Sequence, residues 1–207
     1  MNFVWYALVM LGGYLLGCSN MALYLSKIKK VRMDDKGSGN LGASNALMLM
    51  GVKAGVLVGA HDIGKAWLAV LLARWIFPEL AFADALAGAV CILGHIFPFY
   101  LRFKGGKGFA SYIGAALGQN FWLGLAVSVA VIVIMVVTDY IVIGTVMTVL
   151  VVPVVAGLMA GSVWPTVILL VPTAIILYKH RANFVRIKNG TEFKVSSAFK
   201  GKHRVDK

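Results

Sequence analysis

Apolar residues run through most of this chain in long stretches, and polar residues gather in a few short segments between them. A helix needs about 20 mostly apolar residues to cross the hydrocarbon core of a bilayer. Stretches that meet or approach this length lie at 3–25, 52–77, 80–98, 108–119, 121–138, 140–160 and 163–178. The pattern predicts an all-α, polytopic membrane helix bundle of about seven transmembrane helices. The short, glycine-containing stretch 108–119 decides whether the count is seven or six.

Composition agrees with this class and leaves no room for a soluble domain. The chain of 207 residues is 60% hydrophobic and 14% charged, with a mean hydropathy of +0.84. Soluble domains are roughly 45–50% apolar and about 25% charged. We therefore expect 1–207 to form a single integral membrane domain that ends in a basic cytoplasmic tail, 179–207.

The positive charge of the chain is concentrated beside the predicted spans. The net charge is +12, and five of the 20 lysines and arginines lie in 27–36, three in 102–107 and nine in 179–207. Cytoplasmic loops of membrane proteins carry such an excess of cations, so this distribution indicates membrane topology and disfavours nucleic acid as a partner. With no cation before Lys27, we expect the N-terminus outside and the C-terminus in the cytoplasm. The two cysteines, Cys18 and Cys91, lie in apolar runs without metal or disulfide spacing, and we expect no metal.

The first polar loop, 37–45, reads Gly-Ser-Gly-Asn-Leu-Gly-Ala-Ser-Asn. Its glycines match a dinucleotide fingerprint, but that fingerprint requires a preceding strand, and here an apolar span precedes it. Glycines at a helix start expose backbone N–H groups to an anion, and Ser38, Asn40 and Asn45 add polar groups. The alternative is a capping turn without a ligand.

The second polar loop runs from Gly-His-Ile-Phe-Pro at 94–98 to Phe-Lys-Gly-Gly-Lys-Gly at 103–108. It lacks the Ser or Thr that follows the lysine of a P-loop. Two lysines, Lys104 and Lys107, flank a flexible backbone beside a helix start, which predicts an anion site; the alternative is two lysines that snorkel to water around a hinge. His95 lies at the end of a span, where it needs a partner, in either a structural or a catalytic role.

The third polar segment begins where the last predicted span meets water, with His180, Arg181 and Asn183. Histidine titrates near neutral pH and can take a proton from a hydroxyl. Glu192 stands in a very basic segment, and we expect it to hold residues together through a salt bridge. Within the second span, Asp62 and Lys65 are three residues apart and can pair within the membrane. We interpret this pair as structural, with a proton relay as the alternative.

Together the three segments resemble the acyl-phosphate-dependent glycerol-3-phosphate acyltransferases of bacterial membranes, with motifs in order at 37–45, 94–108 and 180–192. The resemblance covers nearly the whole chain. It implies a seven-helix protein of the bacterial inner (plasma) membrane with its active site facing the cytoplasm. It also implies transfer of a fatty acyl group from acyl phosphate to the 1-hydroxyl of glycerol 3-phosphate, giving lysophosphatidic acid and phosphate. No acyl-CoA, acyl carrier protein, cofactor or metal is implied.

The residues suit this chemistry, because an acyl phosphate is already activated and the enzyme chiefly has to hold two anionic groups together. We expect His180 and Asn183 to be catalytic, orienting or deprotonating the acceptor hydroxyl or binding its phosphate, and Glu192 to be structural. The expected substrate-binding residues are Ser38, Gly39, Asn40, Gly42, Asn45, His95, Lys104, Gly105, Gly106, Lys107 and Gly108. The acyl chain would enter from the bilayer, between apolar helices.

The chain departs from the family's pattern at three positions. Family members usually carry arginine where this chain has Met48, and Arg-Tyr-x-Ser where it has Asp139-Tyr140-Ile141-Val142. Arginine is the preferred bidentate partner of phosphate, so these changes remove phosphate-binding capacity, and an acid at 139 is expected to repel an anion. Two alternatives follow: a family relative with a changed acceptor, or a non-enzymatic protein that binds or transports lipid.

Overall fold

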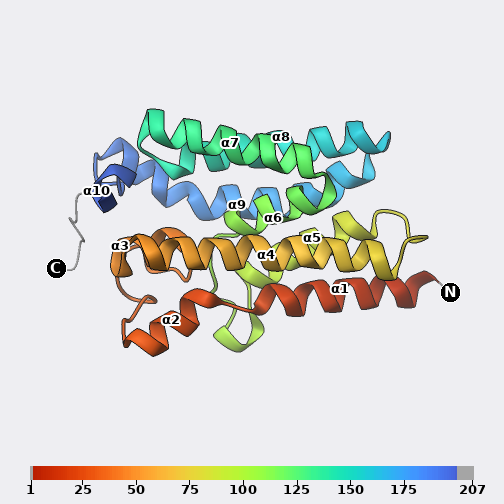
Figure 1. Cartoon of the computed structure of the whole chain (residues 1–207), viewed down its shortest axis with the longest axis horizontal. Coiled ribbons are helices and arrows are strands. Elements are labelled where there is room, and N and C mark those ends of the chain that lie inside the picture. The colour runs from red at the N-terminus through yellow and green to blue at the C-terminus, as the bar shows by residue number, and fades with distance from the viewer. Residues whose placement is uncertain (1, 200–207) are drawn as a thin grey trace.

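The computed structural model describes residues 2–199, and every regular element in that range is helical. Ten α-helices and one 3₁₀ turn follow each other along the chain (Figure 1). Their bounds are α1 Asn2–Cys18, α2 Met21–Lys29, α3 Ala43–Met50, α4 Val52–Ile76, α5 Ala83–Ile96, η1 Phe99–Leu101, α6 Phe109–Gln119, α7 Phe121–Thr138, α8 Ile141–Ala160, α9 Trp164–Lys188 and α10 Val195–Phe199. The predicted all-α membrane bundle is confirmed.

Five candidate spans of this part of the chain are long and apolar enough to cross a membrane. They are α1 with α2, α4, α5 with η1, α7 and α8. The predicted ranges 52–77, 121–138 and 140–160 agree with α4, α7 and α8 to within a residue at each end. The total of seven and the side on which each terminus lies remain predictions.

Helices α5 and α6 form a short pair inside the bundle. At 1.5 Å per residue, their 14 and 11 residues extend roughly 21 and 16 Å, against a hydrocarbon core of about 30 Å. Figure 1 shows the loop between them near the middle of the bundle's long axis. The chain enters α5 from α4 and leaves α6 for α7 at the same end of the bundle. As a result, α1 begins at one end of the bundle and α10 lies at the other.

The expected span 3–25 is interrupted at residues 19–20. Asn20 adopts an extended conformation, and its side chain accepts a hydrogen bond from Leu23 N at 2.8 Å, which caps α2. Its amide also donates to the carbonyl of Leu41 in the first polar loop, at 3.2 Å. The capping side chain begins a new helix and ties it to that loop, which hydropathy alone does not reveal.

The last predicted span, 163–178, continues as helix for another ten residues, to Lys188. We expected a polar tail from residue 179 onward, and its first part is instead a helical extension of α9. Residues 189–199 follow it with a turn and the short helix α10, and 200–207 lie outside the described residues. The extension carries the third motif, so its side chains have helical spacing.

Small residues allow α1 and α5 to approach closely. A side chain added at Gly17 would collide with the backbone of Cys91, and one added at Gly94 would collide with the carbonyl of Tyr14. Close approach at small residues is the usual way in which helices pack in a membrane, where apolar side chains gain little from leaving lipid. This contact holds α5, and the loop that follows it, against the first helix.

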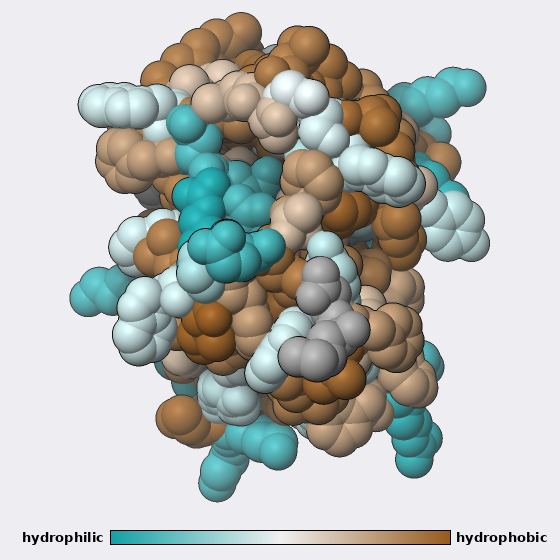
Figure 2. Space-filling model, turned by 90° about the vertical axis from the view of Figure 1, so that its right-hand side faces the viewer, coloured by the Kyte–Doolittle hydropathy of each residue, from teal (hydrophilic) through white to brown (hydrophobic). Residues whose placement is uncertain are grey.

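Large apolar side chains cover the outer surface of the bundle. Val136 and Val137 on α7 are 74% and 77% exposed, and Leu158 on α8 is 76% exposed. Figure 2, which views the end of the bundle where α1 begins, shows apolar side chains over much of that face and one hydrophilic patch. The surface that lipid would cover is the one along the sides of the helices, where these exposed valine and leucine side chains lie.

Candidate active site

The three polar loops meet around one cavity of about 650 Å³. Much of its polar lining comes from the first loop, from Lys107 in the second and from the end of α9 with the segment after it, and Asp62 on α4 and His95 on α5 also border it. Its apolar lining comes from α3, α4, α6, α7 and α8. Among the lining residues are Ser38, Asn40, Gly42, Ser44, His95, Lys107, Gly108, His180, Asn183, Arg186 and Glu192. Segments separated by more than 140 residues thus contribute to one site, as the resemblance implied.

The end of α9 presents three polar side chains on one face. His180, Asn183 and Arg186 are spaced three residues apart, and residues at that spacing lie above one another on a helix. All three line the cavity. Arg186 lies within the third motif, 180–192, but we predicted no role for it. Its spacing from His180 would have indicated a role in the same site if the helix had been predicted to continue past residue 178.

A hydrogen-bonded chain joins the second loop to the third. Lys107 Nζ donates to the side-chain oxygen of Asn183, whose amide donates to Glu192 Oε1 at 2.7 Å. Arg186 Nε lies 2.7 Å from Glu192 Oε2, which forms the ion pair expected of this glutamate. One carboxylate therefore holds the amide and the guanidinium, and the amide in turn meets the lysine.

Charge and burial shift the pKa values of two groups outside the predicted spans: Lys107 in the second loop, and His180 just after the span 163–178. Burial, with Arg186 and Lys179 nearby, lowers the pKa of the Lys107 ammonium to about 8, although Glu192 opposes the shift. Burial also lowers the pKa of the His180 imidazole to about 4, and Lys107 and Arg186 act in the same direction. His180 is therefore neutral near pH 7, beside a lysine that is mostly protonated.

The tautomer of His180 follows from its contact with the backbone. Its Nδ1 lies 2.8 Å from the carbonyl oxygen of Ile176, one turn earlier in α9. A carbonyl only accepts hydrogen bonds, so Nδ1 carries the proton and Nε2 is the acceptor of the neutral ring. The ring that lines the cavity thus has one nitrogen able to accept a hydrogen bond from a hydroxyl.

A second, more open cavity lies on the other side of Lys107. It is lined by Gly39, Asn40, Phe97, Lys104, Gly105, Gly106, Lys107, Ala174, Ile175, Tyr178, Lys179 and Arg181. Asn40 and Lys107 belong to both cavities. Residues of the first and second loops that we expected to bind substrate thus line two adjoining basic spaces.

The glycines of the second loop fit closely against the end of α5. Gly105 N donates to the carbonyl of Ile96 at 3.0 Å, and Gly106 N donates to that of His95 at 3.2 Å. A side chain added at Gly106 would collide with the His95 ring. These two N–H groups are thus already paired, and the loop contributes its lysines rather than a row of free amides.

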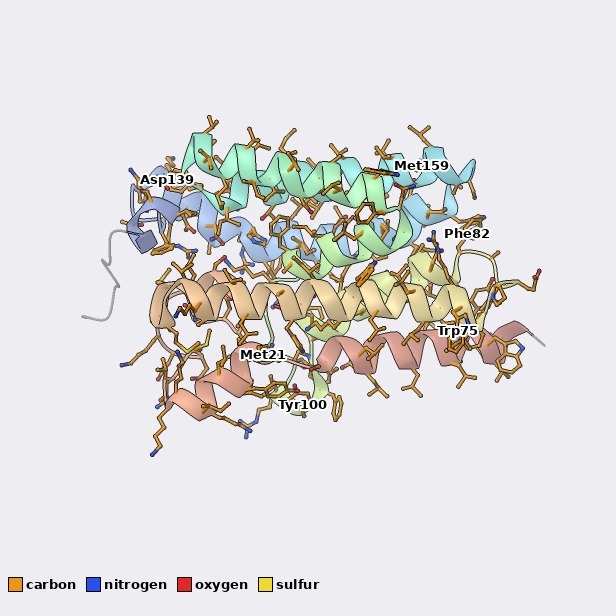
Figure 3. The ribbon with its side chains drawn as sticks, viewed as in Figure 1. Met21, Trp75, Phe82, Tyr100, Asp139 and Met159 are labelled. Carbon is orange, nitrogen blue, oxygen red and sulfur yellow. The ribbon has the colours of Figure 1, made fainter. Side chains whose placement is uncertain are left out.

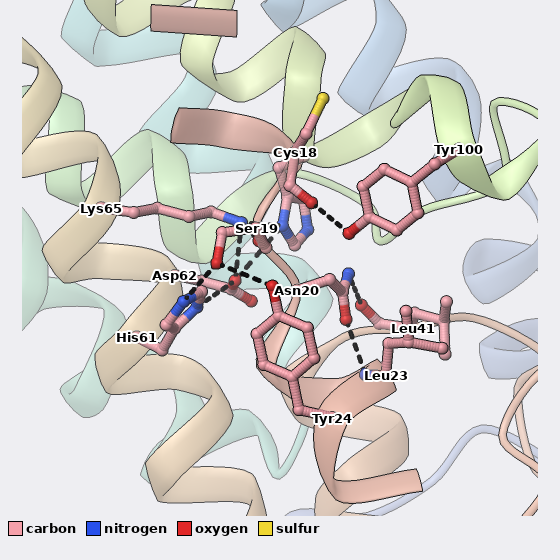
Figure 4. Close-up of polar contacts among 11 residues, drawn as sticks. Cys18, Ser19, Asn20, Leu23, Tyr24, Leu41, His61, Asp62, Lys65 and Tyr100 are labelled. Carbon is pink, nitrogen blue, oxygen red and sulfur yellow. Dashed lines mark hydrogen bonds and ion pairs between the residues drawn. The ribbon is translucent and has the colours of Figure 1, made fainter. Parts of the chain in front are cut away.

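A buried charged cluster lies beneath this loop (Figure 4). Asp62 Oδ1 lies 3.0 Å from Lys65 Nζ and 3.3 Å from His95 Nδ1. Lys65 also reaches His95 Nδ1 at 2.9 Å and the carbonyl of Ser19 at 2.7 Å. The predicted pairing of Asp62 with Lys65 is confirmed, and His95 has its partners. In the part of the chain that the structure covers, no group of three or more His, Cys, Asp or Glu residues is placed to hold a metal ion.

Asn45 has a different place from the one we expected. It is fully buried, lines neither cavity and uses its side chain to hold the first loop together. Its carbonyl accepts from Ser38 N at 2.8 Å, and its amide lies 2.9 Å from the carbonyls of both Met33 and Asn40. The expectation that Asn45 binds substrate is not supported, because its polar atoms already satisfy the loop backbone.

The three divergent positions lie in different surroundings. Met48 and Val142 line the first cavity as apolar wall. Asp139 lines neither cavity, so it is not placed to repel a bound anion as we had expected. Figure 3 shows it at the end of α7, beside α10, where its carboxylate accepts hydrogen bonds from the backbone and hydroxyl of Ser196 at 2.7 and 2.6 Å.

The fold and the site define a helical membrane protein with a basic cavity whose wall is partly apolar. The sequence model of the glycerol-3-phosphate acyltransferase family matches residues 7–190. A glycerol-3-phosphate acyltransferase of Coxiella burnetii is 35% identical over 184 residues, which cover 88% of this chain and 94% of that protein. One from Bordetella pertussis is 34% identical over 196 residues, covering 91% of each.

Two crystal structures of PlsY, an integral membrane glycerol 3-phosphate acyltransferase, share the fold. The glycerol 3-phosphate form has a TM-score of 0.87 and 26% identity, covering 95% of this chain and 98% of that one. The lysophosphatidic acid form has a TM-score of 0.81 and 28% identity, covering 91% and 94%. The chain belongs to the glycerol-3-phosphate acyltransferase family, which confirms the resemblance drawn from its three motifs.

Proposed function

We propose that this protein transfers a fatty acyl group from acyl phosphate to the 1-hydroxyl of glycerol 3-phosphate, giving lysophosphatidic acid and phosphate. The observation that carries the proposal is the meeting of all three motifs in one basic cavity. The solved relatives support it, since they are described as the glycerol 3-phosphate form and the lysophosphatidic acid form of such an enzyme.

Lys107 is the centre of the proposed site, because it borders both cavities. Two phosphate groups placed on either side of it would share its charge, with Arg186 on one side and Lys104 and Lys179 on the other. Ser38 and Asn40 would donate further hydrogen bonds. Holding two anions together in this way supplies orientation and charge neutralisation, which are the main requirements of a reaction with an activated donor.

The acyl chain of the donor would lie along the apolar wall of the first cavity. That wall is built by Leu47, Val52, Val56, Phe109, Ile113, Met135, Ile141, Val142 and others on α3, α4, α6, α7 and α8. Val56 is 64% exposed on the outside of α4, so this wall adjoins the surface that lipid would cover. A long-chain donor could then keep its tail among apolar side chains while its phosphate reaches Lys107.

The acceptor hydroxyl would be oriented by His180. Its oxygen attacks the acyl carbonyl carbon as the bond from that carbon to the phosphate oxygen breaks, and phosphate leaves with the bonding electrons. Nε2 of His180 accepts the hydrogen bond of the attacking hydroxyl. With a pKa of about 4, the ring is a weak base, so the proton finally goes to the departing phosphate, whose oxygen carries the electrons of the broken bond and is more basic than the ring.

The same proposal assigns the site to the cytoplasmic side of a bacterial inner membrane. Loop 27–36 and the basic extension of α9 lie toward the same end of the bundle (Figure 1). Cations gather on the cytoplasmic side of membrane proteins, which supports this orientation. A single cysteine introduced at Lys29 and another at Trp75, in a Cys18→Ala and Cys91→Ala background, would be labelled from opposite sides of an intact cell.

The test is product identification. Purified protein in vesicles receives long-chain acyl phosphate with and without glycerol 3-phosphate, and the products are identified by mass. Formation of lysophosphatidic acid that depends on both substrates is expected. Lack of that product, with folded protein and an active relative as control, would refute the proposal. Consumption of acyl phosphate with another polyol or amine would identify a changed acceptor.

A changed acceptor is the second candidate, and the apolar character of Met48 and Val142 in the cavity favours it. Both stand where the family's pattern has a phosphate-binding or hydroxyl side chain, so the wall offers less to a phosphate than expected. A non-enzymatic lipid carrier would need only the apolar wall. The presence of Lys107, His180, Asn183 and Arg186 around the same cavity gives us no reason to prefer it.

A further inference from the structure

We propose that Asp139 is a positioning residue that latches the segment 191–196 against the cavity. The inference rests on the proposed function for its effect on the reaction, whereas the latch itself is a property of the protein without substrate. Three contacts carry it. Val195 N donates to the Asp139 carbonyl at 3.1 Å, and Ser196 donates to the carboxylate through both its N–H and its hydroxyl.

The geometry of the α7–α8 turn brings this carboxylate to the start of α10. Asp139 ends α7 in the left-handed conformation, with φ of 64°, which aspartate tolerates better than most residues. The first N–H groups of a helix have no partner within the helix. Asp139 supplies an acceptor for the one at Ser196, 57 residues away in the sequence, as a capping side chain normally does from within its own helix.

The latched segment is fixed at its other end as well. Thr191 N and Glu192 N both donate to the Arg186 carbonyl, at 2.8 and 3.1 Å, where α9 ends. Four residues of this segment line the first cavity: Thr191 and Glu192 at the first anchor, Val195 at the second, and Phe193 between them. The segment is therefore a strap across one side of the site, held by α9 at one end and by Asp139 at the other.

The strap carries the residue that organises the basic end of the cavity. Glu192 accepts hydrogen bonds from Asn183 and from Arg186, and Asn183 in turn meets Lys107. If the far end of the strap were released, Glu192 would keep only its contacts to α9. We infer that the latch fixes the position of Glu192, and through it the donors that would meet the acceptor phosphate.

An arginine at position 139 could not make this latch. Its guanidinium has donors only, whereas Ser196 N–H and hydroxyl both need an acceptor here. An arginine side chain would therefore leave the Ser196 N–H without its acceptor, and only the backbone carbonyl at position 139 would still accept from Val195 N. The acid at this position then has a structural use, because it anchors the strap.

Amide hydrogen exchange on the protein without substrate tests the latch directly. We expect Asp139→Ala and Ser196→Ala to raise exchange across 191–196 by about three- to tenfold. A hydrogen bond to a charged group is worth about tenfold or more, and its exposure to solvent reduces that. Ser197→Ala is the matched control, because the Ser197 hydroxyl bonds to the carbonyl of Lys194 within its own turn. Unchanged exchange in both Asp139→Ala and Ser196→Ala would overturn the latch.

Steady-state kinetics test its consequence for the reaction. We expect Asp139→Ala and Asp139→Arg to raise KM for glycerol 3-phosphate by about fivefold with a smaller change in kcat. Asp139→Asn, which keeps one acceptor oxygen, should recover much of the loss. Ser196→Ala should have little further effect in the Asp139→Ala background.

The outcomes are separable. If the wild-type protein forms no lysophosphatidic acid, the proposed function fails while the exchange result still decides whether the latch exists. Faster exchange without any change in KM would refute the positioning role. A lower KM in Asp139→Arg would also refute it, because that result assigns the position to phosphate binding.

Discussion

Two charged clusters in this bundle differ in how far their positive and negative charges balance. In the inner cluster, Asp62, Lys65 and His95 are 2%, 7% and 3% exposed. Lys65 pairs with Asp62, and His95 Nδ1 lies within reach of both, although Asp62 and His95 also border the first cavity. In the outer cluster, Lys107 and Arg186 line a cavity and share the single carboxylate of Glu192, Lys107 through Asn183. The inner cluster is balanced by its own members, whereas the outer cluster has more positive charge than it can pair.

This difference separates structural charge from ligand-binding charge. A charge buried within a membrane protein costs free energy unless an opposite charge or hydrogen bonds compensate it. A paired cluster is therefore most simply explained as a structural contact that holds the helices in place. The inner cluster does this by holding α4, α5 and the Ser19 carbonyl together. An excess of cations at a cavity, by contrast, is satisfied when an anion arrives. The following predictions use that contrast.

The largest effect is expected at Lys107. Lys107→Ala should lower kcat/KM for glycerol 3-phosphate by about a thousandfold, since loss of one partner of a buried charge interaction costs roughly 2–5 kcal/mol. The protein should still fold, because the lysine is not a member of the inner cluster. Initial rates of lysophosphatidic acid formation measure the effect.

Lys53→Ala is the matched control, because Lys53 is exposed and lines neither cavity. It should retain near-normal rates. Activity of Lys107→Ala within about threefold of wild type would remove Lys107 from the site.

Lys65→Met tests the inner cluster. It leaves the Asp62 carboxylate buried without its cation, which should destabilise the protein by about 3 kcal/mol. A lower thermal unfolding midpoint in detergent is the expected measurement. The double variant Asp62→Asn with Lys65→Met should recover part of this loss, since no unpaired charge remains. A midpoint equal to that of wild type in the single variant would contradict a structural role.

The pH dependence of kcat/KM should report Lys107. As the pH rises through about 8, its ammonium loses the proton and with it the charge that attracts phosphate, so kcat/KM should fall about tenfold per pH unit above that point. Lys107→Arg should abolish this fall, because arginine stays charged. A profile that remains flat to pH 10 in the wild type would show that the charge of Lys107 is not required.

The smallest effect is expected at Met48. Met48→Arg would place the family's usual residue in the cavity wall, and we expect KM for glycerol 3-phosphate to fall about threefold, because a bidentate donor is added beside the phosphate. A rise in KM would indicate that the apolar wall at this position is needed, as a changed acceptor would require.

Hydropathy was enough to predict the bundle, because the thickness of the bilayer sets how long the apolar stretch of each spanning helix has to be. It placed the end of the last helix at residue 178, and the helix continues to Lys188. Hydropathy predicts which residues face lipid. It does not predict the side-chain contacts that stabilise a polar helical turn, such as those between Asn183, Glu192 and Lys107. The break at residues 19–20 was missed for the same reason, since it depends on one capping side chain.

The motifs correctly predicted which segments meet at the cavity, but they did not predict the role of every residue in those segments. Asn45 and Ser38 looked equivalent in the sequence, and only the fold turns one inward to hold the loop and leaves the other at the cavity. Asp139 looked like a defect in a phosphate site because its partner, Ser196, lies 57 residues away. Nothing in the local sequence indicates such a pairing.

The most direct test is the thermal unfolding midpoint with and without glycerol 3-phosphate, measured side by side for wild type, Lys107→Ala and Lys65→Met. A ligand that binds the folded state raises the midpoint, and tighter binding at a given ligand concentration raises it more. The account predicts a rise for wild type, a normal midpoint but no rise for Lys107→Ala, and a lowered midpoint with a preserved rise for Lys65→Met. A ligand-induced rise that survives in Lys107→Ala, or that is lost in Lys65→Met alone, would contradict it.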